Sequence, residues 1–340
     1  MERKVKRISI MFICFSLTLC YVFSLGITEA TPFVEANKLI IYTPHEKSPA
    51  LTSIKEFQER TGIQVEVIFA GTGELLDRIR LEKESNTRSV DVLWGGGAES
   101  IAANLDLFEP YVSTVDALIP PEHKDSSDLW IGESPVPVVI MYNTTLVTQE
   151  EAPKSWSDLL DPKWREKIAF ADPAKSGSAY TILATMLISL GGYDSLKLFA
   201  DNLKGHTLDS SKSVYEKVAD GQYSIGLTQE KSVQTLIKQG AKVAISYPED
   251  GTTAVDDTVA IVKGTQKRDE AIRFVEYVLS IPHQKMMESL YNKRPVRLDL
   301  APPEGLPKLK TIPLIAYDLK EASATKAMIL NKWETLMKNY

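Results

Sequence analysis

The sequence predicts an α/β protein whose two lobes are joined by two extended crossover segments. Short strand-like runs alternate with helical runs, and a short polar or glycine-rich loop separates each strand from the helix that follows. The 340 residues also exceed the usual size of one hydrophobic core. Extended segments near 135–143 and 245–262 interrupt the alternation. We therefore expect residues 37–134 plus 252–340 to form lobe 1 and residues 135–251 to form lobe 2.

The first part of the chain consists of three strand–loop–helix units, a pattern typical of a parallel sheet with helices on its faces. Strands are expected in three apolar runs: LIIYT at 39–43, IQVEVIF at 63–69 and VDVLW at 90–94. The helix after each strand should begin at the following loop: Ser48-Pro49, Gly71-Thr72-Gly73 and Gly95-Gly96-Gly97, in that order.

The later part of the chain is expected to be less regular. Prolines punctuate its first extended run, SPVPVVIMYN at 134–143. Further strands are expected in four runs: IAFAD at 168–172, YSIGLT at 223–228, KVAISYP at 242–248 and DTVAIVKG at 257–264. Helices are expected over four stretches: roughly 178–190, 211–219, 269–280 and from about 320 onward.

The N-terminal residues have the order of a secretory signal peptide. Residues 1–7 carry four basic side chains, residues 8–26 carry no charge, and small residues including Ala30 and Ala36 follow. A basic, then apolar, then small-residue order is typical of a segment that is removed on export. We therefore expect a signal peptide over residues 1–30, cleavage after Ala30 or Ala36, and a periplasmic protein. An uncleaved membrane anchor is the alternative.

Both cysteines of the chain, Cys14 and Cys20, lie inside this segment. The exported chain should therefore form no disulfide and no thiolate metal site. Lipidation at Cys20 is another alternative, although Leu19 is larger than the residue such sites prefer. Residues 1–30 carry four basic and two acidic side chains, so removing this +2 from the formal net charge of −6 leaves −8. We expect so acidic a chain to bind neither nucleic acid nor an anionic membrane.

Several of the loops have the features of an anion site, because each leaves backbone amides unpaired at a helix start. Glycine lets a ligand approach those amides, and the helix dipole adds partial positive charge. Ser176-Gly177-Ser178 and Ser210-Ser211 repeat this arrangement in the second lobe. The repetition favours a phosphate, phosphonate or carboxylate ligand. A serine taken alone is more often just an N-cap, and a glycine run is more often plain turn chemistry, so the repetition carries the prediction.

Few other side chains form a chemical pattern. His45 could bind a metal or a phosphate or cap a strand end, and Glu230 could accept hydrogen bonds from a sugar or lie at a solvated loop edge. Asp256 and Asp257 precede a strand, and Trp94 could wall a cleft or belong to the core. No two histidines have metal-ligand spacing, and neither a catalytic His/Asp/Ser order nor a phosphate-binding P-loop is recognisable. We therefore predict no enzyme activity, metal site or cofactor.

Five segments together resemble the family 1 extracellular solute-binding proteins of ABC importers, and more narrowly the ferric-iron-binding-like branch that includes hexose-phosphate and phosphonate binders. They are VDVLWGGG at 90–97, PKSWSDLLDPKWREKIAFADPAKSGSAY at 153–180, VADGQYSIGLTQE at 218–230, YPEDGTTAVDDTVAIVKG at 247–264 and KRPVRLDL at 293–300. The resemblance implies a periplasmic-binding-protein-like (Venus flytrap) fold with a ligand cleft between the lobes. It also implies a monomer whose partners are a small anionic solute and the membrane permease subunits of an importer.

The resemblance further implies a set of ligand-binding residues: Thr43, His45, Thr72, Gly96, Ser176, Gly177, Ser178, Ser210, Ser211, Glu230 and Asp257. Ferric binders of the superfamily carry adjacent tyrosines just after the strand equivalent to 223–228, where this chain has Thr228-Gln229-Glu230-Lys231. Fe(III) prefers hard anionic oxygens such as phenolates, so this difference argues against direct iron binding. Asp256 also replaces the proline that the family pattern has before Asp257.

The sequence therefore predicts the substrate-binding component of an ABC importer for a small phosphorylated solute, with hexose phosphate first and phosphonate second. Ferric iron binding is the alternative within this class. A secreted phosphate-ester hydrolase is the alternative from another class. That enzyme would need a nucleophile with a positioned base, or clustered metal ligands, and the sequence indicates neither.

Overall fold

The computed structural model describes residues 38–87 and 90–338. The predicted signal peptide, its cleavage positions and Cys20 lie outside these residues. The strands of the described part are β1 (Leu39–Thr43), β2 (Val65–Phe69), β3 (Val92–Gly97), β4 (Phe108–Glu109), β5 (Ile131–Asn143), β6 (Ile168–Ala169), β7 (Ile225–Gln229), β8 (Val243–Ser246) and β9 (Ala254–Val262).

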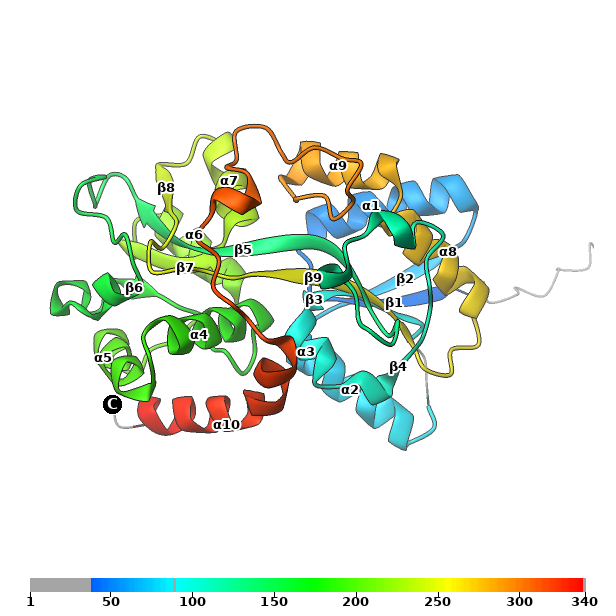
Figure 1. The fold of residues 1–340 in the computed structure, drawn as a ribbon, viewed down its shortest axis with the longest axis horizontal. Coiled ribbons are helices and arrows are strands. Elements are labelled where there is room, and N and C mark those ends of the chain that lie inside the picture. The colour runs from blue at the N-terminus through cyan, green and yellow to red at the C-terminus, as the bar shows by residue number, and fades with distance from the viewer. Residues whose placement is uncertain (1–37, 88–89, 339–340) are drawn as a thin grey trace, which may run out of the picture. The chain divides into compact units, whose positions relative to one another are not determined.

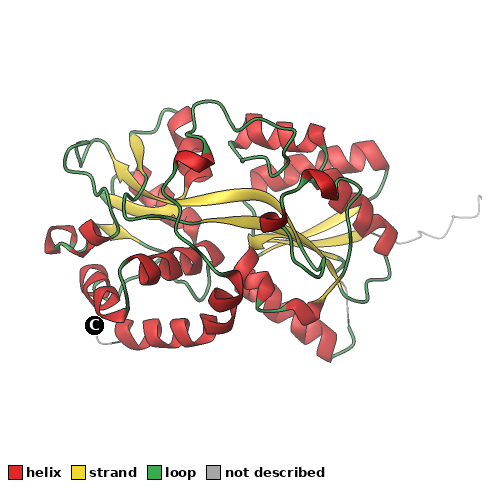
Figure 2. Ribbon diagram, viewed as in Figure 1, coloured by secondary structure: helices red, strands yellow, loops and turns green. Residues whose placement is uncertain are grey.

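Helices flank these strands (Figure 2). They are α1 (Lys47–Thr61), α2 (Thr72–Glu84), α3 (Ala98–Ala102), α4 (Gly177–Ser189), α5 (Tyr193–Leu203), α6 (Ser211–Ala219), α7 (Glu230–Lys238), α8 (Arg268–Val278), α9 (Ile281–Tyr291) and α10 (Leu319–Met337). Every strand and helix range predicted from the sequence corresponds to one of these elements, whereas the sequence predicts none of β4, α5, α7 and α9.

The strands form one sheet in the order β2-β1-β3-β9-β5-β7-β6, with β4 paired to β9 and β8 paired to β5. Strand β1 is parallel to both β2 and β3, as the strand–loop–helix pattern predicts. Strand β9 then runs antiparallel between β3 and β5. Because β1, β2 and β3 are parallel, the loops at their carboxyl ends lie at the same edge of the sheet.

Strand β5 links the two parts of the sheet, and all thirteen of its residues are buried. Its first stretch, from Ile131 to Pro137, pairs with β9, whereas Val138 to Tyr142 pair with β7. Pro135 and Pro137 both belong to the first stretch, and pairing with β7 begins only at Val138. Both prolines therefore have a partner strand on one side only, where a residue without an N–H is tolerated.

The two parts of the sheet have separate apolar cores. Helices α1 and α8 cover one face of β1 to β3, and α2 and α3 cover the other (Figure 1). Trp94 packs into the first of these clusters and its neighbour Leu93 into the second, as alternation along a strand requires. A third cluster, which includes Tyr180, forms where α4, α5 and α6 pack with β5 and β7. Trp94 is thus a core residue.

The sequence predicts that residues 252–340 lie wholly in lobe 1, but helix α10 packs against the third cluster. Its Ile329 and Trp333 belong to the third cluster. The Trp333 ring centroid lies 5.9 Å from those of Phe170 and Phe199. Helix α10 accordingly lies beside α4 and α5 (Figure 1), because its apolar face is buried there. The lobe boundaries themselves stay a prediction.

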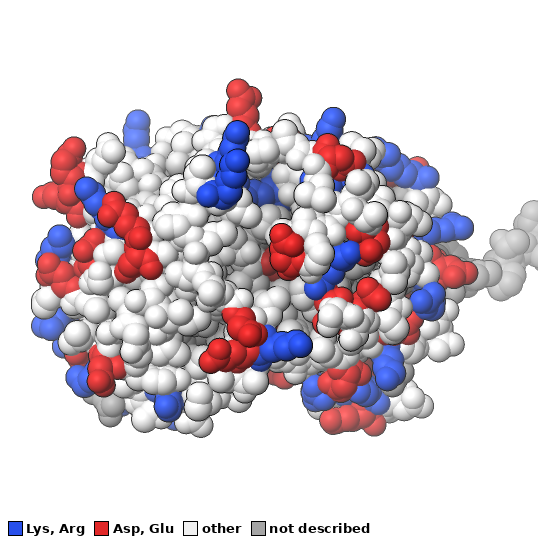
Figure 3. Space-filling view, viewed as in Figure 1, with Lys and Arg blue, Asp and Glu red and all other residues white. Residues whose placement is uncertain are grey.

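Within the ranges described, no helix combines the length and the apolar content that crossing a bilayer requires. On the face of the molecule in Figure 3, acidic and basic side chains are mixed in small groups. That face therefore offers a polyanion no extended basic surface. The expectation that the chain does not bind nucleic acid stays a prediction.

Candidate ligand-binding cleft

A cleft of about 1240 Å³ lies at the carboxyl ends of the parallel strands. Its walls come from loops far apart in the sequence: residues 44–49, 69–74, 96–97, 174–178 and 209–212, together with Asp257 and Lys293. Clefts of this size that collect loops from several strands and helices are the usual binding sites of small molecules. The fold thus creates one site from loops that follow β1, β2 and β3 and loops that precede α4 and α6.

Most of the predicted ligand-binding residues line this cleft: His45, Thr72, Gly96, Ser176, Gly177, Ser178, Ser210, Ser211 and Asp257. Thr43 does not, because it is fully buried at the end of β1. Its Oγ1 accepts a hydrogen bond of 3.2 Å from the backbone N–H of His45 and so orients that loop.

Glu230 is the other predicted residue that does not line the cleft. It is 1% exposed, and each of its carboxylate oxygens accepts a hydrogen bond of 2.8 Å from Arg294. The hydroxyl of Tyr247 donates a further hydrogen bond to Oε1 at 2.5 Å. Glu230 therefore connects α7 to the chain beyond α9, and no ligand reaches it in this arrangement.

Three serine hydroxyls meet at one wall of the cleft. The Oγ of Ser211 lies 2.8 Å from that of Ser176 and 2.5 Å from that of Ser178. Ser176 is the N-cap of α4 and Ser210 is the N-cap of α6, since each Oγ also accepts a backbone N–H of its own helix. The two explanations left open by the sequence thus coincide, because the capping serines also face the cleft.

Three helix N-termini lie at the same cleft. Helix α2 begins at the cleft wall after Gly71, α4 begins after Ser176, and α6 begins after Ser210. The first amides of a helix have no partner within the helix, and the helix dipole makes this end partly positive. An anion between these helix ends would be bound by uncharged donors.

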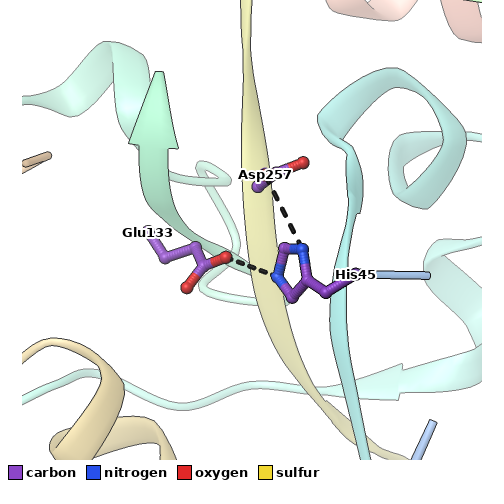
Figure 4. A group of neighbouring side chains, drawn as sticks. All are labelled: His45, Glu133 and Asp257. Carbon is purple, nitrogen blue, oxygen red and sulfur yellow. Dashed lines mark ion pairs between the residues drawn. The ribbon is translucent and has the colours of Figure 1, made fainter. Parts of the chain in front are cut away.

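The base of the cleft is a buried cluster of charged side chains around His45 (Figure 4). The His45 Nε2 atom lies 2.7 Å from Glu133 Oε1, and His45 Nδ1 lies 3.9 Å from Asp257 Oδ2. Lys293 Nζ is 2.6 Å from Glu133 and 3.7 Å from Asp257. Lys231 also pairs with Asp257. Two ammonium groups thus neutralise two carboxylates.

The protonation states follow from burial and from these partners. Burial, assisted by the charge of Lys293, lowers the pKa of His45, so its ring is neutral at pH 7. Burial alone would raise the pKa of Glu133, but Lys293 and His45 outweigh it and hold the pKa well below its usual value. Lys231, His45 and Lys293 likewise lower the pKa of Asp257 against the effect of burial. The cluster is therefore ionised internally and close to neutral overall.

Gly95 makes room for His45 at the end of β3. Its backbone has a φ of 99°, in the left-handed region that glycine adopts without strain. A Cβ atom at this position would also lie 2.8 Å from the imidazole ring of His45, too close for any real contact. The glycine run predicted as a loop is therefore required both by the backbone and by the neighbouring side chain.

Three residues of the same cluster could offer ligand atoms to a metal. His45, Glu133 and Asp257 each offer one ligand atom, and these atoms lie within 4.8 Å of one another. Lys231 and Lys293 already neutralise the two carboxylates, so a metal cation would meet two ammonium groups at close range. The residues present therefore fit a metal poorly unless both lysines move away.

The phenolic side chains of the cleft do not change that conclusion. Tyr215 and Tyr291 line it, and a phenolate is the ligand that Fe(III) prefers. Burial, with the nearby carboxylate of Glu46, raises the pKa of Tyr215 and so opposes formation of the phenolate.

Sequence reasoning misses Lys231 and Lys293 as cleft residues, and it misses Glu133 as the buried carboxylate that pairs with Lys293. Lys293 stands at the start of KRPVRLDL, one of the segments that carry the family resemblance, so a signal for it was available. Lys231 directly follows Glu230, and only its pairing with Asp257 reveals that it faces the cleft. Nothing in the sequence marks Glu133, because its importance arises from the two strands that the sheet brings together.

The sequence model of one family, the bacterial extracellular solute-binding proteins, matches residues 93–323, which is more than half of the chain. The chain belongs to this family. The resemblance inferred from the sequence is thereby confirmed at the level of the family, as is the expectation of a binding protein rather than an enzyme.

Curated relatives of this solute-binding protein cover most of its length. An uncharacterised protein of Haemophilus influenzae is 28% identical over 87% of this chain and 90% of its own. A probable ABC transporter periplasmic-binding protein of Sinorhizobium fredii is 27% identical over 71% of this chain and 69% of its own. Iron uptake protein A1 of Synechocystis is 25% identical over 77% of this chain and 76% of its own. A putative 2-aminoethylphosphonate-binding periplasmic protein of Salmonella typhimurium is 24% identical over 76% of this chain and 77% of its own.

Solved structures share the fold. The periplasmic binding protein AfuA from Actinobacillus pleuropneumoniae, with exogenous fructose-6-phosphate bound, matches with a TM-score of 0.83 and 26% identity, over 88% of this chain and 98% of that chain. The predicted α/β periplasmic-binding-protein fold is therefore confirmed.

Proposed function

We propose that this solute-binding protein is the substrate-binding component of an ABC importer and captures a small phosphorylated solute, with a hexose phosphate preferred over a phosphonate. The observation that carries the proposal is the meeting of the Ser176, Ser178 and Ser211 hydroxyls in the cleft, beside the N-termini of α4 and α6. The names of the relatives, which include a phosphonate binder and a sugar-phosphate complex, are consistent with this ligand class.

The serine cluster supplies what a phosphate group requires. Each hydroxyl can turn its hydrogen away from its neighbour and toward an anion, and the first amides of the adjacent helices have no partner within the helix. Hydrogen bonds to a charged acceptor are roughly twice as strong as those between neutral groups. An uncharged, pre-arranged set of donors therefore suits an anion with several oxygen atoms.

The charge balance at the base of the cleft discriminates between a sugar and an amine. An ammonium group, as in 2-aminoethylphosphonate, would need a surplus of negative charge, whereas Lys231 and Lys293 balance Asp257 and Glu133. A second phosphate would need a surplus of positive charge, which is equally absent from this cluster of described residues. Sugar hydroxyls both donate and accept hydrogen bonds, so a neutral mixture of ammonium and carboxylate groups suits them best. This balance favours the hexose phosphate.

Ferric iron is the second candidate, because His45, Glu133 and Asp257 have a metal-like arrangement and one relative is named as an iron uptake protein. The two lysines oppose it. An accompanying anion would not remove that opposition, because the ammonium groups contact the carboxylates that the metal would need.

The remaining parts of the proposal concern the protein's partners and location. The relative in Sinorhizobium fredii is named as a probable periplasmic-binding protein of an ABC transporter. We accordingly assign this chain the membrane permease subunits as partners and the periplasm as its location, and propose that it acts as a monomer.

Titration calorimetry with glucose 6-phosphate, 2-aminoethylphosphonate and ferric citrate tests the choice of ligand. We expect micromolar or tighter binding of the sugar phosphate and weaker binding of the phosphonate. Ser211→Ala should raise the Kd for the sugar phosphate about tenfold, which corresponds to the loss of one hydrogen bond to a charged group. Ser195→Ala is the control, because Ser195 lies in α5, donates its hydrogen bond to the Leu190 carbonyl and does not line the cleft. Tight iron binding without any response to the organic ligands would refute the proposal.

A further inference from the structure

The two walls of the cleft touch each other through backbone atoms. We call Gly71, Thr72 and Gly73 the first rim, and Ala174 to Gly177 the second rim. The first rim begins α2, and the second leads into α4. A Cβ atom placed on Gly71 would lie closer to the backbone oxygen of Lys175 than real Cβ atoms come. The absence of a side chain at Gly71 is therefore a condition for this contact.

A second contact of the same kind lies beside the first. Thr72 is 3% exposed and fills the space between Gly96 and Gly177. A Cβ atom on Gly177 would approach Thr72 Oγ1 to 2.9 Å, and one on Gly73 would approach the backbone oxygen of Ala174 to 3.1 Å. The rims thus meet over three consecutive residues of the first rim.

We propose that Gly71 and Gly177 are positioning residues for ligand capture, because their missing side chains let the two rims touch and so close the cleft around the solute. This proposal deepens the proposed function. Only the expectation that a sugar phosphate causes closure rests on that function; the contact between the rims does not. Contact between the rims brings the N-termini of α2 and α4 to the same anion and removes water from around it. Hydrogen bonds to that anion are stronger when water is excluded.

Gly71 allows a clean test, because its backbone does not require glycine. Its φ is −67° and its ψ is 151°, which an alanine adopts without strain. The atom that a Cβ would meet is a backbone oxygen, which cannot turn aside as a side chain can. Gly71→Ala should therefore leave each wall of the cleft folded and should disfavour only the arrangement in which the rims touch.

Gly73 provides a milder substitution on the same rim for comparison. A Cβ atom there also faces a backbone oxygen, but at 3.1 Å it needs a shift of only a few tenths of an ångström. Gly177→Ala should have an intermediate effect, because the atom it meets belongs to the Thr72 side chain and can move. The expected order of the loss of closure is Gly71→Ala, then Gly177→Ala, then Gly73→Ala.

The experiment measures the distance between the walls directly, with spin labels on cysteines at positions 55 and 197. Lys55 in α1 and Lys197 in α5 have side chains 76% and 62% exposed. The chain's own cysteines are replaced in all proteins as Cys14→Ser and Cys20→Ser. Distances are recorded by pulsed electron paramagnetic resonance without ligand and with glucose 6-phosphate. Calorimetry gives the Kd, and circular dichroism gives the unfolding temperature of the ligand-free protein.

We expect a short distance in the wild type with ligand, its loss in Gly71→Ala, and a Kd at least about tenfold higher in that variant, since affinity falls with the closed fraction. The Kd of Gly73→Ala should rise less than the Kd of Gly71→Ala, because its clash is smaller. If the wild type ignores the sugar phosphate but shows a short distance that Gly71→Ala removes, the closure mechanism stands and the proposed ligand fails. Normal closure and affinity in Gly71→Ala, or no short distance in any protein, would overturn the inference.

Discussion

Replacing Lys293 by methionine should destabilise the protein and make its stability depend on pH in a new way. The ammonium group of Lys293 is 2.6 Å from Glu133, and both side chains are almost fully buried. Removing it leaves the Glu133 carboxylate without its principal counter-charge. Breaking a buried ion pair by deleting one partner typically costs about 3–5 kcal/mol.

The structure favours the lower end of that range. Glu133 keeps the hydrogen bond of 2.9 Å that Trp94 Nε1 donates to its Oε2. It also keeps His45, whose pKa the charge of Lys293 lowers in the wild type. Without Lys293 the pKa of His45 rises. When the pH is below the pKa that His45 has in the unfolded chain, His45 can therefore be protonated and supply the missing positive charge. The cost should therefore be about 3 kcal/mol at pH 7.5 and smaller at pH 5.5.

Urea unfolding followed by tryptophan fluorescence at the two pH values measures both quantities. The double variant Glu133→Gln with Lys293→Met should recover most of the loss, because no buried charge is then left unpaired. Lys197→Met is the surface control, and its effect should stay within about 0.5 kcal/mol. A loss below about 1 kcal/mol for Lys293→Met, or a loss that grows on acidification, would refute the electrostatic account.

Two further predictions concern stability. Burial lowers the pKa of His283 to about 4, so the native state should lose stability as the pH falls from about 6.5 toward 4, by up to roughly 3 kcal/mol. Thermal unfolding across that range should show a dependence of stability on pH that is smaller in His283→Gln. An unchanged dependence in that variant contradicts the prediction. Trp333→Ala should cost about 3–5 kcal/mol in urea unfolding because the ring packs on Phe170 and Phe199; a loss under about 1 kcal/mol would mean that α10 does not anchor this core.

The parts of the fold that the sequence predicts are those with strong local signals. Strand β1 and helix α6 are found at the predicted residues, because apolar runs and serine caps mark them. Helix α5 was missed although its apolar residues Leu196, Phe199 and Leu203 have helical spacing, since Gly191-Gly192 ahead of it indicates a loop.

Long-range packing explains why the position of α10 was not predicted. The sequence predicts a terminal helix, and one is present. Which core buries Ile329 and Trp333 depends on surfaces formed by residues more than a hundred positions away, such as Phe170 and Phe199. No local pattern encodes that choice.

Some residues of the candidate site are likewise predicted by local sequence signals, whereas others depend on long-range contacts. Loops that end strands and begin helices are visible in the sequence, and these loops supply the serines and glycines of the cleft. Glu230 shows the limit of that reasoning, because its place at the carboxyl end of β7 suggested a ligand contact. Its two oxygens are instead occupied by Arg294, a partner 64 residues away. A carboxylate in a buried bidentate pair cannot turn to a sugar without leaving a guanidinium unpaired, which costs more than a sugar hydrogen bond returns.

The neutrality of the cleft base connects ligand choice with closure. Since Lys231 and Lys293 are committed to Asp257 and Glu133, uncharged hydroxyls and amides provide much of the attraction for an anion. Such donors attract an anion weakly while the cleft is open, because water competes for each hydrogen bond. Once the rims meet, water is excluded and the same donors bind strongly. Glycines at the rim and serines in the wall are therefore parts of one mechanism, in which the wall supplies the donors and the rim supplies the dry surroundings that make them effective.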